Sequence, residues 1–148
     1  MICSGRLGLW INQMRCRSMG HRLVTMSVVE RRRLAGLARN PRCRLTKHTP
    51  QRPCEWNPEG TASARDPDDP FTAPGAWAFI AEHLEAGRDI YSIPLDRPPD
   101  GIGLVIFLPP VPRWRGLYVK FEVAGPGLYG RSFHHPAHPT LDIDEDEP

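Results

Sequence analysis

Tyrosine, lysine, arginine and histidine side chains gather near the end of the chain, between residues 116 and 135. Tyr118 and Lys120 are two residues apart, and Arg131 and His134 follow after a turn. A cation stabilises the charge that develops when a phosphodiester is cleaved, and an imidazole transfers protons near neutral pH. Tyrosine stacks on unpaired bases. These residue types suit either a metal-independent site for RNA cleavage, with Tyr118, Lys120, Arg131 and His134 as the candidate catalytic residues, or an ordinary polar sheet face with a Lys–Glu pair.

The same stretch predicts a β-hairpin that would hold these side chains together. Apolar and polar residues alternate over 117–123, which is typical of a strand with one wet face, and the Ala-Gly-Pro-Gly sequence at 124–127 is typical of a turn. Two registers stay open. A four-residue loop sets Val123 opposite Leu128 and Lys120 opposite Arg131. A three-residue loop sets Lys120 opposite Ser132 and Tyr118 opposite His134, and a bulge would let both sets contribute.

One helix and two further strands are expected to position the hairpin. Thr72 is a candidate N-cap and Gly87 a candidate stop. An apolar stripe lies between them, made of Trp77, Ile80, Ala81 and Leu84. His83 falls off the stripe and is expected to face water. Residues 90–95 predict an edge segment and residues 102–108 a buried strand.

These elements predict an α+β domain over residues 71–136, in which one helix packs on a three-stranded antiparallel sheet. Residues 1–70 predict a basic, largely disordered arm and linker, since residues 1–54 hold twelve Lys or Arg against one acid, Glu30. Within the arm, Ser27 and Glu30 match a capping box for a short basic helix, which suits either nucleic-acid contact or a solvated surface. Residues 137–148 predict an acidic disordered tail.

No feature of the sequence indicates a metal or a cofactor. The four cysteines contain no C-x-x-C pair, which argues against a zinc site. No apolar stretch reaches the roughly 18 residues of a membrane span. We therefore expect a cytoplasmic protein without a membrane partner.

The hairpin resembles the C-terminal hairpin of the motility-quorum-sensing-regulator (MqsR) mRNA interferases, which belong to the RelE-like group of bacterial toxins. Tyr118, Lys120, Ser132 and Phe133 match the family pattern, and His134 stands where the family has a catalytic lysine. The order of helix, turn and strand upstream extends the resemblance to residues 76–136, under half of the chain.

The resemblance implies a RelE-like fold and the function of a type II toxin, a metal-independent endoribonuclease. Its partners would be mRNA at the ribosome and a cognate antitoxin protein. In this interpretation Lys120 and Arg131 hold phosphate, Tyr118 positions a base or the leaving group, and His134 transfers a proton. Glu122 would orient a cation or act as a base.

Two other interpretations stay open. One is a non-catalytic protein-interaction domain of the same fold, whose exposed hairpin edge pairs with a partner strand. The acidic balance of residues 55–148, with sixteen acidic and seven basic residues, favours it. The other is a mis-called or degenerate gene product whose basic arm has no role.

Overall fold

The structure is a computed structural model that describes residues 20–64, 66 and 68–143; residues 1–19 of the predicted arm and 144–148 of the predicted tail lie outside the described residues. The helices are α1 (Val28–Arg39) and α2 (Ala73–Glu85), and two short 3₁₀ turns span Pro41–Cys43 and Pro58–Gly60. The strands are β2 (Arg22–Leu23), β3 (Arg44–Leu45), β4 (Glu55–Trp56), β5 (Tyr91–Leu95), β6 (Gly101–Leu108), β7 (Leu117–Ala124) and β8 (Gly127–His134).

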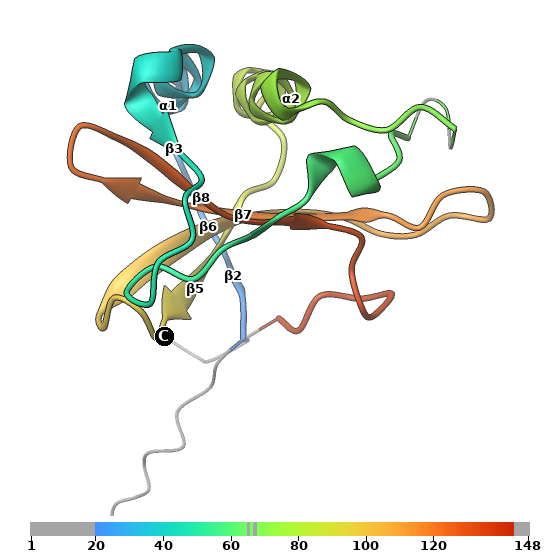
Figure 1. The fold of residues 1–148 in the computed structure, drawn as a ribbon. Helices are drawn as coiled ribbons and strands as arrows, with labels where there is room; N and C mark the ends of the chain where they lie inside the picture. The colour runs from blue at the N-terminus through green and yellow to red at the C-terminus, as the bar shows by residue number, and fades with distance from the viewer. Residues whose placement is uncertain (1–19, 65, 67, 144–148) are drawn as a thin grey trace, which may run out of the picture.

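The predicted fold, one helix on a three-stranded antiparallel sheet, is wrong, and the described part of the predicted disordered arm and linker forms helix and strands. Two helices lie on one face of a seven-stranded mixed sheet with the order β2-β5-β6-β7-β8-β3, and β4 also pairs with β8 (Figure 1). Strands β5 to β8 form antiparallel ladders, whereas β3 and β4 pair with β8 in parallel. The segment predicted as an arm and linker therefore supplies one helix and three edge strands.

Helix α1 begins where the capping pattern predicts. The Ser27 side chain accepts a hydrogen bond from the backbone N–H of Glu30, at 3.1 Å. Leu34, Ala35 and Ala38 are buried in the core. Because this apolar stripe is short and is flanked by arginines, the sequence was equally consistent with a basic helix exposed to solvent.

Helix α2 follows its sequence signals more closely. The Thr72 hydroxyl accepts from the backbone N–H of Gly75, at 2.9 Å, and Gly87 ends the helix region with a positive φ of 73°. The predicted stripe is buried, and its Trp77 ring stacks on Trp56 of β4 with the ring centroids 5.0 Å apart. The helix thus packs on the sheet partly through a strand that the sequence did not predict.

His83 is buried, contrary to the expectation that it faces water. Its Nε2–H donates to the Asp89 carbonyl oxygen at 2.8 Å, because a carbonyl only accepts. Burial lowers the pKa of His83 from its ordinary value of 6.5, with smaller effects from nearby charges. The charged form is therefore disfavoured in the folded state.

We expect the free energy of unfolding to fall as the pH drops through 6.5, because the unfolded chain takes up the His83 proton before the folded chain does. His21, whose pKa burial also lowers, acts in the same direction. Urea unfolding at pH 7.5 and pH 5.5 measures the effect. The variant His83→Gln should show a smaller difference between the two pH values; an unchanged difference would contradict this assignment.

Candidate RNA-binding and catalytic face

A β-bulge in the β7–β8 hairpin brings the four predicted site residues to one face of the sheet. Beside the turn, Val123 pairs with Leu128, as the four-residue loop predicted. Farther along, Tyr118 pairs with His134, as the three-residue loop predicted. Arg131 is the extra residue that separates the two registers. Each proposed register therefore holds on one side of the bulge, and both sets of side chains contribute.

This face points away from the helices and is named here the open face. In Figure 1 the two helices lie on the other side of the sheet, while the segment after β8, coloured red, lies on the side of the open face. Leu117, Val119 and Phe121 alternate with the site residues of β7 and are buried in the core beneath the helices. The alternation predicted for this strand is confirmed over residues 117–121, whereas Glu122 is buried and Val123 is exposed.

Two residues that the sequence analysis missed join the open face. The parallel register of β4 sets Glu55 opposite Ser132 and turns the next residue, Trp56, toward the helices. His21, just before β2, contacts Tyr118. Both come from short segments without apolar periodicity, so no sequence signal placed them here.

The imidazole of His134 is partly exposed. Its Nδ1–H donates to the His135 carbonyl oxygen at 2.8 Å, which leaves the lone pair of the neutral ring on Nε2. Nε2 lies 3.6 Å from Glu55 Oε1, beyond hydrogen-bond length, and the two side chains are 35% and 81% exposed. In this tautomer Nε2 is an acceptor, and the side chain that carries it is partly exposed and lies beside the Glu55 carboxylate.

Tyr118 stacks on His134, with the ring planes 13° apart and the centroids at 5.7 Å. Its hydroxyl lies 2.8 Å from Nε2 of His21. Since Nδ1 of His21 donates to the Asp142 carbonyl oxygen at 3.1 Å, Nε2 of the neutral ring accepts a hydrogen bond from the tyrosine hydroxyl. Burial raises the pKa of Tyr118 to about 12, so this hydroxyl stays protonated at neutral pH.

Lys120 lies on β7 between Tyr118 and Glu122. Its stem passes over Gly103 of β6, where a Cβ atom would lie 3.2 Å from Lys120 Cγ. Burial lowers the pKa of Lys120, and the charge of Arg131 adds to the effect, whereas Glu55 and Asp96 oppose it. The ammonium is thus partly desolvated, which strengthens its interaction with an arriving anion.

Arg131 reaches the same face but is buried. Its Nη1 donates to Glu122 Oε1 at 2.7 Å, and both side chains are only 5% exposed. Nε donates to the Pro53 carbonyl oxygen at 2.8 Å and Nη2 to the Arg97 carbonyl oxygen at 2.7 Å. The guanidinium thus binds three segments of this chain, and Glu122 is enclosed with it.

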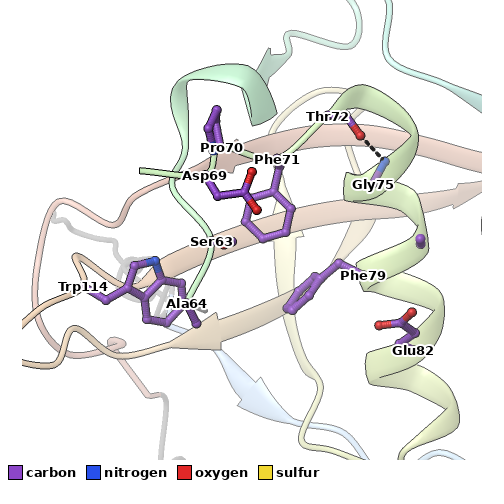
Figure 2. Close-up of a pocket in the computed structure, with 11 residues that line it drawn as sticks. Ser63, Ala64, Asp69, Pro70, Phe71, Thr72, Gly75, Phe79, Glu82 and Trp114 are labelled. Atoms are coloured by element: carbon purple, nitrogen blue, oxygen red, sulfur yellow. Dashed lines mark hydrogen bonds between the residues drawn. The ribbon is translucent and has the colours of Figure 1, made fainter. Parts of the chain in front are cut away.

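A separate pocket of about 470 Å³ lies beside α2 and does not include the predicted site residues. Figure 2 shows Phe71, Phe79 and Trp114 around it, with the carboxylates of Asp69 and Glu82. The Trp114 indole is held by a hydrogen bond from Nε1 to the Ala62 carbonyl oxygen, at 2.8 Å. The cations and histidines needed for phosphodiester chemistry lie on the open face instead.

No family model, curated protein or solved structure matches this chain. Within residues 20–64, 66 and 68–143, no group of three or more His, Cys, Asp and Glu side chains is placed to hold a metal ion. Neither helix of the described part of the chain is long and apolar enough to cross a membrane.

Proposed function

We propose that the open face binds single-stranded RNA and cleaves it without a metal ion, as the toxin of a type II toxin–antitoxin pair acting on mRNA in the cytoplasm. One observation carries the proposal. The partly exposed imidazole of His134 lies on the same face as the partly desolvated ammonium of Lys120 and the ring of Tyr118. A base, a cation and a stacking surface are the groups that this reaction needs.

In the proposed reaction, His134 Nε2 removes the proton of a ribose 2′-hydroxyl. The 2′-oxygen bonds to phosphorus, and the bond from phosphorus to the 5′-oxygen of the next nucleotide breaks. Lys120 stabilises the negative charge of the phosphorane and gives a proton to the leaving 5′-oxygen. The products are a 2′,3′-cyclic phosphate and a 5′-hydroxyl end, and Tyr118 holds a base beside the reacting phosphate.

A cognate antitoxin would neutralise the protein by covering the open face. The rival proposal, a hairpin edge that recruits a partner strand, finds less support. The outer edge of β8 is already paired with β3 at residues 128–129 and with β4 at residues 132–133. A partner strand would have to displace these short strands first.

The test is an assay of the full-length chain on single-stranded RNA, with and without ribosomes, in the presence of a chelator. We expect cleavage products that carry a 2′,3′-cyclic phosphate. Expression of the chain without an antitoxin should slow bacterial growth. Intact RNA in every reaction, together with unchanged growth, would overturn the catalytic proposal.

Lys120→Ala is expected to weaken RNA binding and to make the remaining binding less sensitive to salt. Loss of one phosphate contact should reduce the slope of log K against log salt by about 0.7 for a single strand. The assay uses an oligonucleotide without the reactive 2′-hydroxyl, so that binding is measured without cleavage. Lys47 is the other lysine of the chain and is exposed, which makes Lys47→Ala the matched control. Equal slopes for both variants would remove Lys120 from the phosphate site.

A further inference from the structure

A small pocket of about 250 Å³ opens between the sheet and the segment that follows β8. The sheet contributes Phe107, Tyr118 and His134, with His21 beside them, and the segment contributes Pro136, Ala137, His138, Thr140, Leu141 and Asp142. Pockets for drug-sized ligands usually measure about 300–1,000 Å³. This pocket is smaller and suits a single flat ring system.

Aromatic rings shape the pocket. Tyr118 and His134 stack nearly parallel, and the His21 ring stands almost perpendicular to Tyr118, at 81° with the centroids 5.8 Å apart. Phe107 pairs with Tyr118 across the β6–β7 ladder. A planar aromatic ligand gains stacking and edge contacts on such walls, and nucleobases stack well on aromatic side chains.

The charge of the lining fits a base better than a phosphate. Among the described residues that line the pocket, none is a lysine or an arginine. Burial lowers the pKa of His21, and the charge of Lys120 lowers it further, against an opposing effect of Asp142, so the ring is neutral at pH 7. A pocket lined by aromatic rings and by Asp142, without a lysine or arginine, offers little to an anion, whereas the ammonium of Lys120 is the group on β7 that attracts one.

We propose that this pocket holds one unpaired nucleobase of the RNA, belonging to a nucleotide at the cleaved phosphodiester. The inference rests on the proposed function, because it places the base relative to the phosphate that Lys120 would bind. Lys120 and Tyr118 point to the same face two residues apart, which is about 6.6 Å along a strand. That spacing lets the phosphate of a nucleotide contact Lys120 while its base lies against Tyr118.

The test uses short non-cleavable RNA analogues in which one base at a time is removed and the sugar-phosphate backbone is kept. One position should lose about tenfold or more in affinity, because the stacking of one base is lost, and the other positions should lose little. Ala137→Trp places a bulky side chain at the exposed rim of the pocket. It should weaken binding of the intact strand and abolish the effect of removing that base. Ala86→Trp, an equally exposed site at the end of α2, is the matched control.

A second experiment distinguishes the nucleobase pocket from the cleavage proposal. Free nucleosides at millimolar concentration should shift the NMR signals of the His21 and His134 rings in the wild-type chain and not in Ala137→Trp. If nucleosides bind in this way but no RNA is cleaved, the pocket stands and the catalytic proposal falls. If RNA is bound and cleaved while every base can be removed without loss and Ala137→Trp binds normally, the pocket proposal is overturned and the catalytic one stands. The pocket proposal is also overturned if nucleosides do not shift the NMR signals of His21 and His134 and all analogues bind with equal affinity.

Discussion

Replacing His134 with glutamine is expected to slow RNA cleavage roughly 10²–10⁴-fold while the fold stays intact. Glutamine keeps an N–H group that can donate to the His135 carbonyl oxygen, which the imidazole bonds at 2.8 Å. It has no group that accepts a proton near neutral pH. Single-turnover cleavage at saturating enzyme, together with urea unfolding, separates a loss of chemistry from a loss of structure.

Two further variants make the His134 result specific. His48 is an exposed histidine on the loop between β3 and β4, so His48→Gln should cleave RNA at the wild-type rate. His134→Lys replaces the imidazole with an amine on a flexible stem. Because a lysine loses its proton only near pH 10.4 in water, this variant should regain activity as the pH rises. A His134→Gln protein that cleaves at the full rate would show that the imidazole is not the base.

The sequence predicted the elements whose signals are local. Helix α2 has an N-cap, an apolar stripe and a glycine stop within 16 residues, and the hairpin has alternation around a turn. Strands β2, β3 and β4 are two residues long each and have no period of their own. They are strands because β5 and β8 offer unpaired edges to them, and such long-range pairing leaves no trace in a short segment of sequence.

The candidate site was predictable only in part, because only some of its residues are placed by a local sequence signal. Alternation on β7 placed Tyr118 and Lys120 on one face without knowledge of the partner strand. The bulge could not be located, because either register satisfied the apolar pattern. The sequence predicted that Arg131 would be free to bind phosphate. In the structure its guanidinium donates to the carbonyl oxygens of Pro53 and Arg97, which are far away in the sequence.

Arg131 is therefore expected to stabilise the fold and not to bind phosphate. Replacing it with methionine, which keeps part of the stem volume, leaves Glu122 buried without its closest cation. Breaking a buried ion pair in this way typically costs about 3–5 kcal/mol. The carbonyl groups of Pro53 and Arg97 lose a donor as well. The loss is measured as the change in the free energy of unfolding in urea at pH 7.

Arg52 provides a matched control on the same carboxylate. Its Nε lies 3.1 Å from Glu122 Oε1, but its side chain is 34% exposed, so Arg52→Met should cost only about 0–1 kcal/mol. A double variant, Arg131→Met with Glu122→Gln, should be less destabilised than the sum of the two single variants, because it leaves no buried charge. RNA binding supplies the opposing test, at a temperature where Arg131→Met is folded. The slope of log K for RNA binding against log salt should be the same for Arg131→Met and the wild type. A lower slope with unchanged stability would show that Arg131 binds phosphate.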